Sequence, residues 1–214
     1  MIPALFAPDL PETCRQVLRV LAPAFDSVTA ELCLLERDGL GAWQSNGSAI
    51  PVVLGRSGLA WGLGEHQAVR PTDFSMKREG DGCSPAGVIC LPLAFGEVPP
   101  AGCRLPWLPV TETMIAVDDP KSRFYNQIVD SAQVANDWAS TELMQRDDGL
   151  YRHGIVIAHN PANVSGAGSC IFMHLWRGEG LPTAGCTAMS EENLMRVLAW
   201  LDPALEPRLV QWVA

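Results

Sequence analysis

The chain has 214 residues, with 15 Lys or Arg against 24 Asp or Glu, so its formal net charge is −9 at pH 7. This length fits one large domain, and an apolar content of 48% with seven tryptophans is enough to fold around an internal core. The acidic balance and the lack of any basic run argue against a nucleic-acid partner. No stretch of about 18 apolar residues occurs, so the sequence predicts no transmembrane span.

The N-terminal part of the chain predicts a short amphipathic helix over residues 11–22. Pro11 suits the first turn of a helix, and Pro23 would end it. We therefore expect an N-terminal helical segment at residues 1–26, followed by one globular domain at residues 27–214.

The body of the chain has the pattern of β-strands. Residues 28–36 and 42–54 are rich in apolar and β-branched side chains, and the Asp38-Gly39 pair between them is a hairpin signal. Residues 96–126 are rich in Pro and turn formers, which is typical of an irregular segment draped over a sheet or of a lid beside a cleft. Further strands are predicted at residues 88–94, 154–159 and 169–176.

A C-terminal helix is predicted from Ser190 onward. Ser190 is a favourable N-cap, two glutamates complement the helix dipole, and Pro203 stops the helix. Its apolar stripe comprises Leu194, Val197, Leu198 and Leu201. The predicted fold class is therefore mainly β with peripheral helices, an α+β arrangement.

The strand predicted at residues 169–176 ends close to a histidine. Because side chains alternate along a strand, His174 lies on one face and the purely apolar residues lie on the other. We therefore expect the apolar face to pack in the core and the His174 face to line a pocket. The pocket set is Cys170, Phe172, His174 and Trp176, and the core set is Ile171, Met173 and Leu175.

A cysteine follows this strand in a setting suited to nucleophilic chemistry. Cys186 lies twelve residues after His174 and directly after Thr183-Ala-Gly185. A thiol needs a nearby imidazole to become a nucleophile, and a preceding glycine lets the backbone approach a substrate carbonyl. A buried structural cysteine and a core histidine are the plainer alternatives.

The other cysteines allow disulfides but do not suggest a metal site. Apart from Cys186 there are six, enough for up to three bridges in an oxidising compartment, and Cys83 with Cys90 or Cys103 is the local pairing. No Cys-x-x-Cys pair occurs, and the spacings do not match a structural zinc site. We expect no metal and no cofactor.

The Thr183-Ala-Gly185-Cys186 block, with His174 upstream on a strand, resembles the catalytic motif of the L,D-transpeptidases, which have the YkuD-type fold. The Ser84-Pro-Ala-Gly87 segment resembles the hairpin that precedes the active site in that family. The resemblance covers about residues 50–203. Asp118-Asp-Pro, the segment from Tyr125 and Trp138 look like the longer bacterial branch of the family.

Two positions depart from the usual motif. Ala184 stands where the family has a histidine, and Ala188 stands where Arg or Asn is common. The gap between His174 and Cys186 is also shorter than usual. The cysteine and histidine roles survive these changes, while the cross-link type, 3–3 or 1–3, is left open.

The resemblance implies a YkuD-like β-sandwich or barrel that carries out cysteine acyl transfer on peptidoglycan stem peptides. Cys186 would form a thioester with the donor stem, and His174 would act as general base and acid. The backbone carbonyl of Leu175 would orient His174. The N–H groups of Gly185 and Cys186 would stabilise the oxyanion.

Five further residues are expected to contact the substrate. Arg177 can grip a substrate carboxylate, although such a residue is as often a simple rim residue. Trp176 would form an apolar wall, and Thr183 and Thr187 flank the catalytic segment. His159 ends its own strand and could line the same pocket, with a structural hydrogen bond as the commoner role.

Other functions on the same fold stay open at this point. An L,D-carboxypeptidase or endopeptidase would use the same cysteine and histidine with water as acceptor, and a non-catalytic wall-binding module would use neither. The expected partners are donor and acceptor stem peptides. Wall cross-linking predicts a periplasmic location with the export signal absent from the displayed chain, and a cytoplasmic location is the alternative. No oligomeric state is predicted.

Overall fold

The computed structural model describes residues 1–4 and 6–214, except for the side chain of Pro8. Within these residues the chain is mainly β, which confirms the predicted fold class at that level. The helical elements are α1 (Glu191–Trp200) and the short 3₁₀ turns η1 (Ala7–Asp9) and η2 (Pro203–Leu205). The strands are β1 (Gln16–Ala22), β2 (Thr29–Arg37), β3 (Trp43–Ser45), β4 (Ile50–Val53), β5 (Leu59–Trp61), β6 (Ser84–Cys90), β7 (Ala94–Gly96), β8 (Trp107–Pro109), β9 (Met114–Val117), β10 (Gln127–Asp130), β11 (Thr141–Leu143), β12 (His153–Val156), β13 (Phe172–Leu175), β14 (Thr187–Met189) and β15 (Arg208–Val213).

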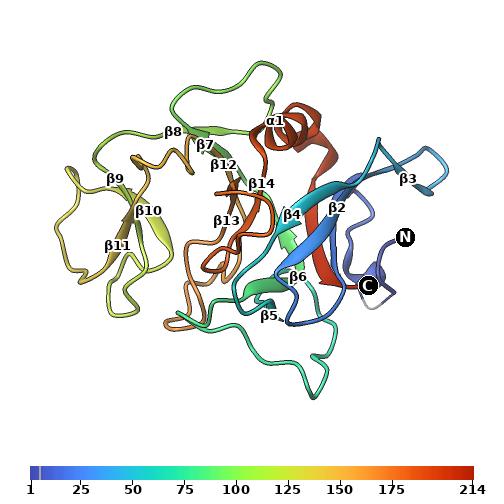
Figure 1. Cartoon of the computed structure of the whole chain (residues 1–214), viewed down its shortest axis with the longest axis horizontal. Helices are drawn as coiled ribbons and strands as arrows, with labels where there is room; N and C mark the ends of the chain where they lie inside the picture. The colour runs from blue at the N-terminus through green and yellow to red at the C-terminus, as the bar shows by residue number, and fades with distance from the viewer. Residues whose placement is uncertain (5) are drawn as a thin grey trace.

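Most strands belong to one large mixed sheet. Its order is β5-β6-β15-β1-β2-β4-β14-β13-β12-β7-β8, with β3 paired to β2 outside this path. A separate three-stranded sheet has the order β10-β9-β11. Figure 1 shows this small sheet at the far side of the molecule from the two chain ends, with β12, β13 and β14 between them. The strands near His174 therefore belong to the part of the large sheet that lies nearer the small sheet.

The helix predicted over residues 11–22 is wrong, because most of this segment is strand β1. β1 pairs in parallel with β15 and antiparallel with β2, so it belongs to the large sheet and is not part of a separate N-terminal helical segment. Val17, Leu18 and Val20 are fully buried, so side chains on both faces of β1 are covered. A short apolar run that is buried on both faces has no clear period, and periodicity alone cannot separate such a strand from a helix.

The first predicted hairpin is present. β2 and β3 pair antiparallel, and the Asp38 carboxylate accepts the N–H groups of Leu40 and Ala42 at 2.8 and 2.9 Å. The strand predicted at residues 42–54 is divided into β3 and β4. Asp38 therefore has the turn-forming role that short acidic side chains commonly have.

The Ser84-Pro-Ala-Gly87 segment is not a hairpin. It forms the first half of β6, which pairs in parallel with β5 and antiparallel with β15. Ser84, Pro85 and Ala86 are buried. Pro85 is accommodated inside the sheet although proline cannot donate a hydrogen bond, and its carbonyl accepts the side-chain amide of Gln211.

The middle segment, residues 96–126, is more ordered than its composition suggests. It contains β8 and β9, and β9 is the central strand of the small sheet. Ala116 is fully buried and packs in the cluster that contains Phe95 and Phe172. The β9 part of this segment therefore packs against the body of the protein and does not form a free lid.

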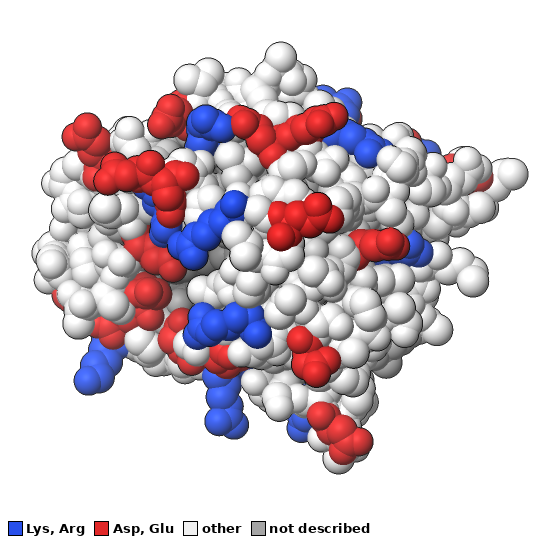
Figure 2. All heavy atoms as spheres, viewed as in Figure 1, with Lys and Arg blue, Asp and Glu red and all other residues white. Residues whose placement is uncertain are grey.

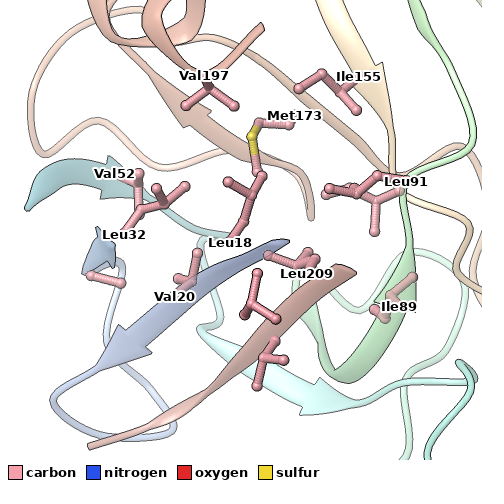
Figure 3. Packing of buried hydrophobic residues seen from close by; sticks show 14 of the residues in the cluster. Leu18, Val20, Leu32, Val52, Ile89, Leu91, Ile155, Met173, Val197 and Leu209 are labelled. Carbon is pink, nitrogen blue, oxygen red and sulfur yellow. The ribbon is translucent and has the colours of Figure 1, made fainter. Parts of the chain in front are cut away.

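The main hydrophobic core lies between the large sheet and α1. Figure 3 shows side chains from β1, β2, β4, β6, β13, β15 and α1 converging there, among them Leu18, Met173 and Val197. The predicted C-terminal helix is confirmed: Ser190 caps it by accepting the Asn193 N–H at 3.4 Å. Its predicted stripe of Leu194, Val197, Leu198 and Leu201 is fully buried.

All seven cysteines are free thiols, so the suggested pairing of Cys83 with Cys90 or Cys103 is not found. Cys83 directly precedes β6 and Cys90 ends it. Seven residues of extended strand span roughly 23 Å, far more than the ~6 Å between the Cα atoms of a disulfide. The Cys83 thiol instead donates to the carbonyl of Ser57.

The surface carries charges of both signs. Figure 2 shows acidic and basic side chains interspersed on the face seen there, with much uncharged surface between them. Across the described residues, no helix has the length and apolar character needed to cross a bilayer.

Candidate active site

A small pocket brings together most of the residues that the sequence singled out. Its volume is about 200 Å³, and its wall includes both Cys186 and His174. Three other predicted residues also line it: Trp176, Arg177 and Thr183. The rest of the wall is Glu142, Arg146, Leu150, Tyr151, Leu181, Pro182 and Ala184.

Neighbouring residues donate hydrogen bonds to the backbone carbonyl and to the thiol of Cys186. Its carbonyl accepts the Ser84 hydroxyl at 3.0 Å and the Thr183 hydroxyl at 2.6 Å. Its Sγ accepts the N–H of Phe172 at 3.3 Å. The residue is 8% exposed, and burial followed by the charge of Glu142 raises the pKa of the thiol to about 12. The resting thiol is therefore neutral.

His174 is oriented by the next residue along the chain. Its Nδ1 lies 2.7 Å from the carbonyl oxygen of Leu175, which is the contact that the family resemblance implied. A carbonyl only accepts, so Nδ1 carries the proton and Nε2 is left with a free lone pair. Burial is the largest influence on this imidazole and lowers its pKa to about 4. At neutral pH, His174 is thus an uncharged base.

The two side chains come from neighbouring parallel strands. In the β13–β14 pairing, Met173 is opposite Thr187 and His174 is opposite Ala188. Cys186 immediately precedes β14, and its thiol is hydrogen-bonded at Phe172, two residues before His174. In the part of the chain that the structure describes, no hydrogen bond joins the Cys186 thiol to His174. The resting arrangement is a neutral thiol and a neutral imidazole that share one pocket.

Gly185 does not have the role expected of it. Its N–H donates to the Thr183 hydroxyl at 3.0 Å, so this amide is already used inside the turn. Thr183 accepts that bond and donates to the Cys186 carbonyl, and so holds the turn closed. The Cys186 N–H has no hydrogen-bond partner among residues 1–4 and 6–214 and is the amide available to an oxyanion.

Thr187 and His159 lie outside this pocket, contrary to expectation. Thr187 is fully buried, and its hydroxyl donates to the side chain of Gln211 at 2.9 Å. His159 Nδ1 accepts the N–H of Leu63 at 3.2 Å, and its Nε2 lies 2.9 Å from the carbonyl of Ala167. Thr187 points to the other face of β14 because side chains alternate, and His159 has the structural hydrogen bonds that a buried histidine commonly makes.

The sequence reasoning missed three charged or polar residues of the pocket wall. Tyr151 precedes β12 and donates its hydroxyl to Glu142 of β11 at 2.6 Å. The guanidinium of Arg146 lies 5.0 Å from the centre of the Tyr151 ring. None of these residues belongs to a motif with a characteristic spacing. The approach of β11 to β13 is a tertiary contact, and a single sequence carries no direct sign of it.

Arg177 is the pocket's more available cation. Arg146 is bound by both nitrogens to Asp148, at 2.9 and 2.6 Å. Arg177 is exposed at the rim, whereas Trp176 is half-buried beside it. Over the described parts of the chain, no group of three His, Cys, Asp or Glu side chains is placed to hold a metal ion.

Comparisons with protein-family models, with characterised proteins and with solved structures found no match for this chain. The pocket and the resemblance of its sequence motif are therefore the features that point to a function.

Proposed function

We propose that this protein is a peptidoglycan L,D-transpeptidase with a YkuD-like catalytic domain, acting outside the cytoplasmic membrane through a thioester on Cys186. The observation that carries the proposal is the hydrogen bond between His174 Nδ1 and the Leu175 carbonyl. It leaves Nε2 as a free base in the pocket that also contains the thiol. A glycine before the cysteine, and a Cys186 amide without a hydrogen-bond partner in the described part of the chain, fit an acyl-transfer site.

The proposed reaction begins with a neutral thiol. His174 Nε2 takes the proton from Sγ while Sγ attacks the scissile carbonyl of the donor stem, and the oxyanion accepts the Cys186 N–H. The C–N bond breaks, and His174 returns the proton to the leaving amine. The amine of the acceptor stem then attacks the thioester, its proton passes through His174 to Sγ, and a new amide bond is formed.

Arg177 and Trp176 support recognition of a stem peptide. An exposed guanidinium at the pocket rim can bind a carboxylate with both nitrogens, and the indole beside it offers an apolar wall. Exchange of one amide for another needs no external energy source, so the site requires no nucleotide.

The test is incubation of the purified protein with donor and acceptor stem peptides, followed by mass spectrometry. We expect cross-linked dimers from the native protein and none from Cys186→Ala. His174→Ala should lower the rate by about 10²–10⁴ while the domain stays folded. Incubation with a carbapenem should leave one covalent adduct, on Cys186.

Each failure has a distinct meaning. Shortened stems without dimers would show that water is the acceptor, and the protein would then be an L,D-carboxypeptidase or endopeptidase. No adduct on Cys186, together with no change in the stem peptides, would refute the enzymatic proposal and leave a wall-binding module.

A further inference from the structure

The chain directly before β13 has an unusual backbone conformation beside the reactive sulfur. Cys170 has a φ of 53°, in the left-handed region that residues other than Gly, Asn and Asp rarely adopt. Its side chain lines a different cavity from that of Cys186, and its thiol donates to the carbonyl of Val117 at 3.4 Å. A residue in this conformation persists only where its surroundings fix it, and such residues cluster at functional sites.

Two backbone groups of this segment face the Cys186 sulfur. Sγ accepts the Phe172 N–H at 3.3 Å and donates its proton toward the Cys170 carbonyl at 3.8 Å. When negative charge develops on sulfur, the bond from the N–H becomes stronger, because a hydrogen bond to a charged acceptor is stronger than one to a neutral acceptor. Burial is the largest influence on the pKa of this thiol and raises it, and the Phe172 N–H acts against that effect.

The side chain of Asn126 fixes the conformation of Cys170. Its Oδ1 accepts the Cys170 N–H at 2.8 Å. Its Nδ2 lies 3.1 Å from the carbonyl oxygen of His159 and 3.0 Å from that of Asn160, so only one orientation of the amide satisfies all three contacts. Asn126 directly precedes β10, and its own N–H donates to Val117 of β9 at 2.8 Å. The small sheet therefore anchors the segment that leads to the sulfur.

We infer that Asn126 is a positioning residue for the reaction at Cys186: it holds Cys170 in the left-handed conformation, so that the Phe172 N–H is aimed at Sγ and stabilises negative charge there. The inference rests on the proposed function, since it takes Cys186 as the nucleophile. Charge develops on sulfur when His174 removes the thiol proton, and again when the C–S bond of the thioester breaks. In the second step sulfur keeps the bonding electron pair and receives a proton through His174.

The titratable and charged groups around this sulfur come from several elements, and replacing Asn126 alters none of them. They are Glu142 of β11, Arg146 and Tyr151 between β11 and β12, His174 of β13, the Cys170 thiol and Lys77. In the described chain the wall of the Cys186 pocket does not include Asn126. A change at Asn126 should therefore alter kcat and leave KM unchanged.

The first experiment compares the native protein with Asn126→Gly. Glycine accepts the φ of 62° at this position and lacks the Oδ1 acceptor. Alkylation of Cys186 by iodoacetamide is quantified by peptide mass spectrometry as a function of pH. The profile of the variant should shift to higher pH by about one unit, so that the rate at pH 8 falls about tenfold. With stem peptides, kcat should fall by about the same factor at an unchanged KM. An unchanged alkylation profile with a native circular dichroism spectrum would overturn the inference.

Asn163→Gly is the matched control. Asn163 also has a left-handed φ, of 52°, and its Oδ1 accepts from Asn126 Nδ2 at 3.1 Å. It belongs to the same network, whereas the Cys170 N–H bonds to Asn126. This control should keep a nearly native alkylation profile. A loss as large as that of Asn126→Gly would show that any weakening of the network slows the thiol, and would overturn a specific role for Asn126.

Substitutions of Cys170 test the same geometry without changing Asn126. Cys170→Val should slow alkylation of Cys186 as Asn126→Gly does, because a β-branched residue opposes a positive φ. Cys170→Gly accepts that φ and should keep the native rate. Combined with Asn126→Gly, it should restore most of the lost rate. Equal rates for Cys170→Val and Cys170→Gly, or no recovery in the double variant, would overturn the inference.

Failure of the inference and failure of the proposed function can be distinguished, because alkylation needs no stem peptide. A slower Asn126→Gly in a protein that forms no dimers would refute the proposed function and leave the positioning of the sulfur intact. Dimer formation by the native protein, with the native alkylation profile in Asn126→Gly, would refute this inference alone.

Discussion

At the scale of single residues, the position of the Cys186 backbone depends on two hydroxyls. Thr183 and Ser84 both donate to the Cys186 carbonyl, and Thr183 also accepts the Gly185 N–H. Ser84 in turn accepts the N–H of Gly55, which ties the turn to the end of β4. Because these groups are buried or half-buried, each hydrogen bond prevents a costly unpaired polar atom.

Replacing Thr183 by valine tests this function of the hydroxyl. Valine keeps the shape but leaves the buried Gly185 N–H unpaired, so unfolding should require about 1–3 kcal/mol less free energy. Alkylation of Cys186 should become slower or less uniform as the turn loosens. Urea unfolding and iodoacetamide labelling measure the two effects.

The matched control is Thr183→Ser, which keeps the hydroxyl and loses only a methyl group. It should restore most of the stability and the labelling rate. Equal behaviour of the serine and valine variants would contradict a hydrogen-bonding role for this side chain.

At the scale of elements, the parallel pairing of β13 with β14 positions the pocket. β13 sends Met173 into the main core and Phe172 into the second cluster, so its two faces separate two apolar regions. Cys170 has a positive φ of 53°, which interrupts the strand and explains why β13 begins only at Phe172. The alternation predicted for residues 169–176 therefore continues across a backbone kink.

Helix α1 covers the core side of β13, and we expect its N-terminal cap to stabilise the folded protein. Ser190 accepts the Asn193 N–H, and Glu191 and Glu192 follow in the first turn. Ser190→Ala should lower the free energy of unfolding by about 1 kcal/mol. Chemical denaturation of the native protein and the variant measures this difference in the free energy of unfolding.

Ser190→Asp is the matched control, since aspartate caps a helix as well as serine does. It should keep native stability. A loss equal to that of the alanine variant would show that the cap contributes nothing and that core packing alone holds α1.

At the scale of the whole molecule, buried histidines couple stability to pH. Burial is the largest influence on both His159 and His174, and it lowers the pKa of each to about 4. The unfolded chain binds these protons near pH 6.5, whereas the folded chain does not until about pH 4. The contribution of these two neutral histidines to the free energy of unfolding is therefore fully present above pH 6.5 and is lost as the pH falls toward 4.

The loss should amount to about 3 kcal/mol for each histidine between pH 6.5 and 4. Urea unfolding at pH 7, 5.5 and 4.5 measures it. His159→Gln should be less stable at pH 7 but show a shallower decline, because it has one fewer group to protonate. Identical unfolding free energies at pH 7 and 4.5 in the native protein would contradict the argument.

The sequence by itself determined the features that depend on local pattern. The mainly β class, the capped α1 and the division of residues 169–176 into two faces follow from propensity and period, which are properties of neighbouring residues. The pairing of His174 with the Leu175 carbonyl was also foreseeable, from the motif and because the two residues are adjacent. Cys186 and His174 share a pocket because Cys186 immediately precedes β14, and β14 pairs in parallel with the strand that carries His174.

Only the tertiary structure decided the rest. β1 is a strand because β2 and β15 flank it, and an apolar run buried on both faces has no period of its own. Glu142 and Tyr151 enter the pocket because β11 and the start of β12 approach β13 from distant parts of the chain. Gly185 is not available as an oxyanion donor because its N–H is hydrogen-bonded to the Thr183 hydroxyl. In each case the outcome depends on which partner reaches a polar group or an apolar face, and that is determined by packing.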